Sequence, residues 1–490
     1  MKKIYCLLFT VWVMTLFSCQ VEKYNADPNN PMTVSPQVLL PDVLFYSCRN
    51  GNERECSLLT RYTVGVSDIQ DWQTYNLPRG SFSQYDQLRN ITKMQEACAG
   101  NPQNNAYLAI AHILRVHNFY TLTMLYGDVP YSEALQGENM DKPVEERFYP
   151  SYDRQKSIFI GLLNELEEAN QLLKDESLTI EGDIIYEGDI KKWRKLANSY
   201  KLKILIMLSN RTDDADLKPA EAFARIIADP LNYPIFESEE EQAQLDYLNS
   251  QGVMYPCYND LDMRNKRFIG DVICDLLVSL KDPRLFVFAQ PAVSFSGEIP
   301  ADDFRAYKGL DASKALTDVS ADAATGEYSR ININRYTSDP VGEPALFLSY
   351  SELMLAKAEA AVRGWISADA SLCYQEAIRA SFNYYGCEAD YEDYVVRNAF
   401  DENRGLEQIC QQRYILFFMQ GDYESWFHTL RTGYPHIECG KGQMVSQLPY
   451  RLRYPQNEID VNQEHMEEAL SAQGFQEDAS DQKPWIFDIM

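Results

Sequence analysis

The sequence predicts a mainly α protein whose scaffold consists of paired helices. Many segments repeat apolar residues at intervals of three and four, as in residues 157–173, where one predicted face is apolar and Glu165 and Glu167 occupy the other. Alternating strand patterns are few and short. In residues 348–386 two helical patterns follow each other across Gly364, and small residues on the first allow the second to approach closely. Residues 348–386 therefore indicate a tetratricopeptide-like helix pair, but no strict repeat of about 34 residues is visible elsewhere in the sequence.

Seven segments carry the helical pattern clearly enough to be assigned as helices. They are residues 106–125, 157–173, 192–208, 271–280, 349–363, 369–382 and 406–419. The candidates for strands are residues 285–289 and 330–336. Long passages rich in Gly, Pro, Asn and Asp separate the helices, at residues 27–41, 136–152, 249–270, 290–341 and 433–462. In a compact protein, loops of this length commonly carry function.

The N-terminal segment has the pattern of a secretion signal that ends at a lipid attachment site. Two lysines precede a short apolar run, and the small Ser18 stands directly before Cys19. The run is shorter than the roughly 20 residues that a membrane-spanning helix needs. We therefore expect residues 1–18 to be removed as a lipoprotein signal peptide and Cys19 to carry the lipid. The alternatives are an ordinary cleaved signal and an N-terminal membrane helix.

The mature chain is predicted to be one domain, residues 19–490, with residues 20–41 as an N-terminal tether. Loss of Lys2 and Lys3 with the signal changes the formal net charge from −27 to −29. A negative charge of this size disfavours binding to nucleic-acid phosphates. No apolar run after residue 18 is long enough to span a bilayer. We therefore expect the lipid alone to hold the protein on a membrane.

Nine cysteines remain once Cys6 leaves with the signal and Cys19 carries the lipid. An odd number leaves at least one thiol without an intramolecular partner, and the sequence holds no C-x-x-C motif. We interpret most of the nine as small buried apolar residues rather than as a disulfide framework.

Three segments that suggest a function have a structural interpretation. In YGDVPY, residues 126–131, Gly127 ends a helix, Asp128 bonds the turn and Pro130 prevents the helix from resuming. In residues 191–203, lysines and arginines alternate with apolar residues at helical spacing, which predicts a solvated face over a core face. The third set combines charged and aromatic residues, which we interpret as interior ion pairs and arginine stacking. Its members are Asp422, Trp426, His428, Arg431 and Arg451.

Most catalytic motifs are missing from the sequence. It contains no H-E-x-x-H, G-x-S-x-G or P-loop, and its five histidines lack metal-ligand spacing. A zinc or serine-hydrolase mechanism is therefore disfavoured. A glycosidase needs only two carboxylates across a sugar, so 72 acidic residues leave that alternative open. Asp260 and Asp262 carry oxygen ligands suited to calcium, but the Gly and Glu of an EF-hand loop are missing. No metal or cofactor is assigned.

Eight segments carry a family resemblance through their joint order along the chain. They are VHNFYTLTMLYGDVPYSEAL (residues 116–135), KKWRKLANSYKLKILIMLSNR (191–211), SLKDPRLFVFAQPA (279–292), YKGLDAS (307–313), EPALFLSYSELMLAKAEAAVRGW (343–365), IRASFNYYG (378–386), QRYILFFMQGDYESWFHTLRTGYP (412–435) and LPYRLRYPQNEIDVN (448–462). Together, behind a lipoprotein signal, they resemble the SusD/RagB family of outer-membrane nutrient-binding lipoproteins from Bacteroidota, in particular its SusD-like second subgroup.

The resemblance implies a right-handed scaffold of four tetratricopeptide-like helix pairs, with loops and extra helices on one side that form a ligand-binding surface. It also implies a binding protein rather than an enzyme. Such proteins act as a hinged lid on a TonB-dependent transporter, a SusC-like barrel, and deliver a nutrient to it. The implied ligands are oligosaccharides, with peptides as the ligands of some relatives.

Aromatic residues on polar loops are the candidates for ligand contact, because sugar recognition needs flat aromatic faces beside hydroxyl-binding groups. The candidates are Trp72, Tyr75 and Asn76 in residues 68–76, and Tyr255, Tyr258, Asn259 and Arg264 in residues 255–268. The alternative for Trp72 and Tyr75 is packing on a following helix.

We therefore expect a lipid-anchored cell-surface protein that binds a glycan and passes it to a TonB-dependent transporter. The alternatives are binding of a peptide or another nutrient by the same architecture, a surface glycosidase or peptidase, and a subunit that closes the barrel without contacting ligand.

Overall fold

The computed structural model describes residues 34–68 and 70–488. The predicted signal peptide, Cys19 and most of the predicted tether lie outside the described residues.

The described chain is mainly helical, with a few short strands. The α-helices are α3 (Pro36–Cys48), α4 (Glu53–Leu59), α5 (Asp71–Thr74), α6 (Gln84–Cys98), α7 (Asn105–Tyr126), α8 (Val144–Phe148), α9 (Gln155–Leu172), α10 (Ile190–Met207), α11 (Pro219–Ala228), α12 (Leu261–Lys266), α13 (Asp271–Leu280), α14 (Arg284–Phe288), α15 (Leu316–Ala324), α16 (Ile333–Tyr336), α17 (Tyr350–Val362), α18 (Ala370–Tyr385), α19 (Tyr391–Arg397), α20 (Gly405–Leu416), α21 (Glu424–Thr432), α22 (Gln456–Val461) and α23 (Gln463–Ala472). The strands are β1 (Thr63–Gly65), β2 (Ala243–Leu245), β3 (Arg267–Ile269) and β4 (Ala345–Leu348).

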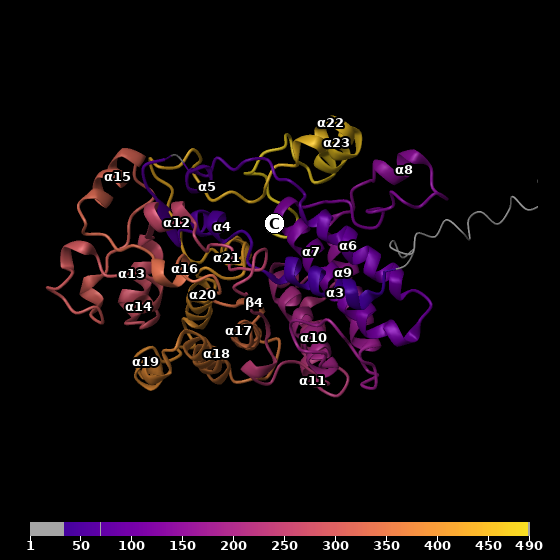
Figure 1. Cartoon of the computed structure of the whole chain (residues 1–490), viewed down its shortest axis with the longest axis horizontal. Coiled ribbons are helices and arrows are strands. Elements are labelled where there is room, and N and C mark those ends of the chain that lie inside the picture. Colours follow the sequence, from indigo (N-terminus) through magenta and orange to yellow (C-terminus); the bar gives the residue numbers. More distant parts are fainter. Residues whose placement is uncertain (1–33, 69, 489–490) are drawn as a thin grey trace, which may run out of the picture.

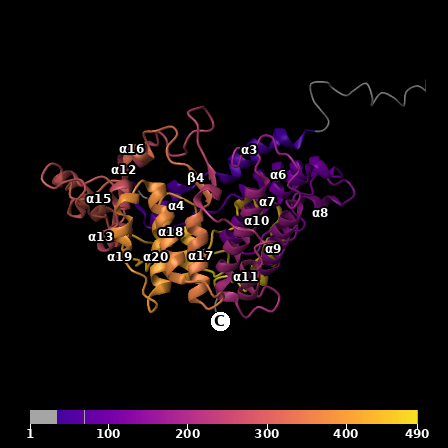
Figure 2. The ribbon, with the colours of Figure 1, turned by 90° about the horizontal axis from the view of Figure 1, so that it is seen from below.

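Four pairs of successive helices form the scaffold: α6 with α7, α9 with α10, α17 with α18, and α20 with α21. The pairs also pack on one another, since α7 contacts α9 and α17 contacts both α10 and α20. Figure 2 shows α17, α18 and α20 side by side, next to the block that contains α9, α10 and α11. The predicted class, a mainly α scaffold of helix pairs, is confirmed.

Polar residues begin several scaffold helices, and glycines end them. The side chain of Asp189 accepts hydrogen bonds from the first turn of α10, and Ser349 does the same for α17. Gly386 ends α18 in the left-handed conformation. Gly127 ends α7 with φ 90°, and a Cβ atom there would lie 2.1 Å from Gln473 Oε1. The structure therefore confirms that Gly127 has a structural role.

The four strands make two small antiparallel sheets that tie distant segments together. β1 pairs with β3, with Thr63 opposite Ile269. β2 pairs with β4, with an irregularity between Ala243 and Gln244. In Figure 1 the short helices α5 and α8 and the C-terminal helices α22 and α23 lie on the upper side, opposite α11, α18 and α19 on the lower side. The upper side therefore carries loops and extra helices, while the helix pairs continue below.

One large hydrophobic core runs from α3 to the C-terminal segment. A small second cluster forms around Val64, Phe268 and Leu310. Eight of the nine described cysteines are buried, Cys439 is half-buried, and none of these nine forms a disulfide, which confirms their interpretation as packing residues. No helix among the described residues has both the length and the apolar character needed to cross a membrane.

Four sequence predictions need correction. Residues 285–288 belong to α14 rather than to a strand, because Pro283 and the Asp282–Arg284 ion pair begin a helix there, and only Ala289 makes a strand-like bridge, to Ile331. In residues 330–336, only Arg330 and Ile331 make strand-like bridges, and residues 333–336 form α16. The predicted tether ends before residue 36, since Leu40 is buried in α3.

The fourth correction concerns the lysines of residues 191–203. Two of them, Lys201 and Lys203, are buried rather than solvated. Each has an acidic partner: Lys201 Nζ lies 2.5 Å from Glu167 Oε2, and Lys203 Nζ lies 2.9 Å from Glu424 Oε1. The predicted solvated face therefore holds only for part of this helix.

A buried carboxylate at the centre of the scaffold joins three helices. Glu359 of α17 is completely buried and receives two bonds from Arg431 of α21, at 2.5 and 2.9 Å. Arg413 of α20 lies 2.8 Å from the same carboxylate. Arg451 pairs with Asp478 and stacks on Tyr454. The interpretation of this set as interior ion pairs and arginine stacking is confirmed for Arg431 and Arg451.

Candidate ligand-binding site

A polar cavity of about 190 Å³ opens where the turn between α3 and α4 meets α6, α7 and the turn before α21. Figure 1 labels these helices. Its lining combines aromatic, amide, hydroxyl and charged side chains. The lining residues are Tyr46, Ser47, Arg49, Gly51, Asn52, Ser83, Gln84, Gln87, His117, Asn118, Thr121, Gly421, Asp422, Tyr423, Glu424 and Phe427. We call it the polar cavity.

Two tight turns, bonded to each other, build one wall of the polar cavity. The Asn50 side chain donates to Gln420 Oε1 at 2.6 Å, and the Asn50 side-chain oxygen Oδ1 accepts from the backbone N–H of Gly421 at 3.2 Å. Asn52 donates to Asp422 through its backbone and its side chain, at 2.8 and 2.9 Å. Asp422 holds a φ of 49°, which is unusual for a residue with a side chain. Strained turns of this kind persist where the surroundings fix them, and they are frequent at ligand sites.

The polar cavity contains hydrogen-bonding groups that the protein leaves unused. The Arg49 guanidinium stacks 4.6 Å from the centre of the Tyr46 ring, and no carboxylate of the described residues lies within ion-pair distance of it. The side-chain oxygen of Gln87 is enclosed and has no donor among the described residues. Buried polar atoms normally have a partner. A ligand with several hydroxyl groups would supply partners to both residues.

Burial controls the charge of the groups around the polar cavity. Burial raises the pKa of Asp422, and the hydrogen bonds from Asn52 limit the rise. Burial, together with the charge of Asp422, raises the pKa of Glu53 well above its usual value. Burial and the charge of Lys203 lower the pKa of His117 to about 3, so its imidazole is neutral at neutral pH. His117 is therefore a neutral hydrogen-bonding group in the lining.

The first group of predicted ligand residues lies next to the polar cavity but does not line it. Trp72 on α5 is half-buried, and its ring centre lies 6.1 Å from that of Tyr423 in the cavity wall. Asn76 is exposed. Tyr75 is only 1% exposed, and its hydroxyl oxygen accepts a hydrogen bond from Arg61. The prediction that Tyr75 stacks on a ligand is therefore wrong, because its ring is part of the core.

The second group lies apart from the polar cavity. Tyr255 is 2% exposed and packs edge-on against Tyr247, so it too is a core residue and its prediction as a ligand contact is wrong. Tyr258 is half-buried and Asn259 is exposed. Arg264 donates to the backbone oxygen of Thr337 at 2.8 Å. Tyr258, Asn259 and Arg264 stay predictions, as do Trp72 and Asn76.

Asp260 and Asp262 are engaged within the protein. Asp260 accepts the first-turn N–H of Met263 at the start of α12. Asp262 accepts from both Nε and Nη2 of Arg267, at 2.9 and 2.6 Å. These contacts give both carboxylates a structural role without calcium.

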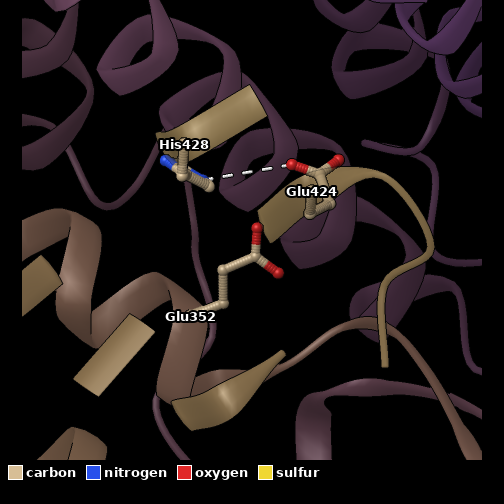
Figure 3. A group of neighbouring side chains, drawn as sticks. All are labelled: Glu352, Glu424 and His428. Atoms are coloured by element: carbon tan, nitrogen blue, oxygen red, sulfur yellow. Dashed lines mark ion pairs between the residues drawn. The ribbon is translucent and has the colours of Figure 1, made fainter. Parts of the chain in front are cut away.

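One buried cluster among the described residues has ligand atoms close enough to hold a metal ion. Figure 3 shows Glu352, Glu424 and His428 facing one another, and their ligand atoms lie within 4.8 Å of one another. The ammonium group of Lys203 lies 3.0 Å from Glu352 and 2.9 Å from Glu424. The lysine therefore already supplies the cation that two buried carboxylates need. We interpret the cluster as an internal ion-pair network behind the polar cavity, of which Glu424 lines the floor.

The fold described above agrees with the protein family and the solved structures to which the chain is similar. A family model described as starch-binding and associating with the outer membrane, the second SusD-like model, matches residues 28–455. The chain belongs to the SusD-like family. Proteins of this family are outer-membrane-associated binding proteins. No protein with a curated description matches the chain.

Solved structures of SusD-like proteins share both sequence and fold with this chain. An outer membrane protein of Bacteroides vulgatus, whose suggested role is nutrient binding, is 34% identical with a TM-score of 0.85, and the match covers 93% of this chain and 100% of that one. Two SusD homologues of Bacteroides fragilis are 33% and 32% identical, with TM-scores of 0.82 and 0.84. Those matches cover 94% and 93% of this chain and all of the other chains.

Sequence reasoning missed most of the residues that line the polar cavity. Arg49 and Gln87 lie outside every quoted segment, whereas Asn118 and Thr121 lie in residues 116–135, whose pattern indicates a helix and the family resemblance but no ligand contact. In the sequence Asp422 belongs only to a charged segment, and its bonds to Asn52 give it a structural role in the cavity wall. The one sequence signal for this cavity is the Gly421–Asp422 pair, which predicts a tight turn but does not show which residues lie opposite that turn.

Proposed function

We propose that this SusD-like protein binds a glycan at the cell surface and delivers it to a TonB-dependent transporter, with the lipid on Cys19 as its anchor. The observation that carries the proposal is the polar cavity in a member of a nutrient-binding family. Its amides, hydroxyls and guanidinium can bond sugar hydroxyls, and Tyr46 and Tyr423 offer flat faces. Trp72, beside Tyr423, extends this aromatic surface.

Calorimetry on residues 20–490, with a panel of oligosaccharides and peptides, tests the ligand class. A saturable heat signal from one or more oligosaccharides, and none from the peptides, is the expected result. Binding of peptides alone would replace the glycan in the proposal. Release of a shorter product during incubation would indicate a glycosidase instead.

Substitution of Trp72 by alanine is expected to weaken glycan binding roughly 2- to 10-fold, because a stacked aromatic ring contributes about 0.5–1.5 kcal/mol beyond its buried area. The same titration measures the change. Phe148→Ala is the control, because Phe148 is an exposed aromatic residue on α8, outside the polar cavity. Equal affinity for Trp72→Ala and the unmodified protein would remove Trp72 from the site.

Substitution of Cys19 by alanine is expected to release the protein from the outer membrane, since a thioether-linked lipid can no longer form. Fractionation of cells, followed by detection of the protein in membrane and soluble fractions, measures the effect. Cys439→Ala is the matched control and is expected to stay with the membrane. Retention of Cys19→Ala in the outer membrane would show that another element anchors the chain.

A further inference from the structure

The polar cavity is small, and its lining includes both exposed and fully buried residues. Ligand pockets that enclose drug-sized molecules are roughly 300–1,000 Å³, so a cavity of about 190 Å³ takes a smaller group. Tyr46 is 39% exposed at the mouth, where Gly51 and Ser83 are also exposed. Asn118 and Phe427 are buried. The exposed fraction of the lining therefore falls from the mouth inward.

Packed protein lies behind the floor of the polar cavity. Glu424, on the floor, is bonded to Lys203 and lies 3.4 Å from the Tyr120 hydroxyl, which donates to it. Lys203 in turn bonds Glu352 of α17. A sugar unit in the interior of a chain is linked on two sides and needs two exits, whereas the last unit of a chain needs only one.

We propose that the polar cavity recognises the end of a glycan chain and encloses a single terminal sugar unit, with the rest of the chain leaving over Tyr46 toward solvent. This inference rests on the proposed glycan binding and adds the mode of recognition. A terminal sugar carries a free hydroxyl that an internal unit lacks, because the glycosidic bond replaces it.

The unused polar atoms of the polar cavity can recognise that hydroxyl. The enclosed oxygen of Gln87 has no donor of its own and can accept from an O–H group once its side chain turns toward the cavity, and the Arg49 guanidinium donates to oxygen. Asn118 uses its amide N–H groups on Ser47 Oγ and Leu114 O, at 3.2 and 2.9 Å, which fixes the orientation of its side chain in the lining. A site that is built to bond a hydroxyl discriminates strongly against a ligand that lacks it.

The test compares linear hexasaccharides with the same chains after each end is modified. The probes are α-1,4-glucan, β-1,4-xylan and β-1,4-mannan hexasaccharides, each free, reduced at the reducing end, or O-methylated at the terminal hydroxyl of the other end, together with cyclic β-cyclodextrin. For the class that binds, we expect modification of one end to weaken binding at least about tenfold and modification of the other to have little effect. We expect the affinity for the glycan to stop increasing once the chain is two or three sugar units long.

Three outcomes separate this proposal from the proposed function. Equal binding of both modified forms and the free chain, or affinity that rises up to six units, would overturn end recognition while leaving glycan binding intact. Binding of β-cyclodextrin as tight as that of the linear glucan would do the same. No binding of any chain would overturn the glycan-binding function and end recognition together.

Two variants test the polar cavity itself. Ser83→Trp places a large side chain at the exposed mouth and is expected to weaken binding of the free chain at least about tenfold, whereas Ser81→Trp, at an exposed position outside the lining, is the matched control. Gln87→Leu removes the unpartnered oxygen and is expected to weaken binding about tenfold without lowering Tm. Unchanged binding in both Ser83→Trp and Gln87→Leu would exclude the polar cavity as the site.

Discussion

Substitution of Glu359 by alanine is expected to destabilise the protein by about 3–5 kcal/mol, because it leaves buried arginines without their anion. Arg431 and Arg413 are both buried, and both lie within 3 Å of this carboxylate. The expected loss of stability is large because the helices α17, α20 and α21 meet at the Glu359 carboxylate. Urea denaturation at pH 7 measures the change in the free energy of unfolding.

The same residue predicts how stability depends on pH. Burial alone would raise the pKa of Glu359, but Arg431 and Arg413 outweigh burial and hold that pKa well below its usual value. A lowered pKa in the folded protein means that the stabilisation is present above the usual glutamate pKa of about 4.3 and is lost as the pH falls below it. We therefore expect the difference in the free energy of unfolding between the unmodified protein and Glu359→Ala to become smaller as the pH falls below about 4.3.

Glu376→Ala is the control for Glu359→Ala. Glu376 pairs with Arg379 on the surface of α18, where an exposed ion pair contributes about 0–1 kcal/mol. A loss below about 1 kcal/mol for Glu359→Ala would show that the arginines find other partners or water when the carboxylate is removed.

Much of the scaffold can be predicted from the sequence, because long amphipathic helices repeat their buried positions. Residues 271–280 form a helix with the predicted bounds, and the predicted helix at residues 106–125 differs by one residue at each end. The helix α6 was not predicted, since its buried face consists of only Leu88, Ile91, Met94 and Cys98 in a polar segment. Sequence periodicity finds a helix only when its buried face is broad.

Short segments and the candidate site depend on partners that are distant in the chain. Residues 285–289 are apolar and short, so their pattern does not separate a strand from a helix. Tyr75 and Tyr255 lie in polar stretches of the sequence. In the fold, Tyr75 bonds Arg61 and Tyr255 packs against Tyr247, so both rings are buried in the core. The polar cavity forms from segments near residues 50, 85, 118 and 422. No local pattern in the sequence shows that these four segments meet.

Substitution of Lys203 by methionine is expected to destabilise the protein by about 3–5 kcal/mol at pH 7, because Glu352 and Glu424 then face each other in the interior without a cation. His428 cannot replace the lysine, since burial and the charges of Arg413 and Arg431 lower its pKa well below the usual value. Methionine keeps the length and the apolar stem of lysine. The effect therefore reports the lost charge rather than a cavity.

The pH range in which the loss of stability shrinks separates Lys203→Met from Glu359→Ala, because both losses shrink in acid but that of Glu359→Ala does so only below about pH 4.3. Burial raises the pKa of Glu424 even with Lys203 present, and removal of the ammonium raises it further. A raised pKa makes the ionised carboxylate unfavourable in the folded protein, so the penalty is greatest at neutral pH and falls as the pH drops through that pKa. Urea denaturation at pH 7 and pH 5 should show the loss shrinking, and Lys203→Met/Glu424→Gln should recover part of it. A loss of stability that is equal at both pH values would contradict this explanation.

Because Glu424 also forms the floor of the polar cavity, we expect Lys203→Met to weaken glycan binding as well. Such a loss of binding would show that the charges of the scaffold hold the site in place.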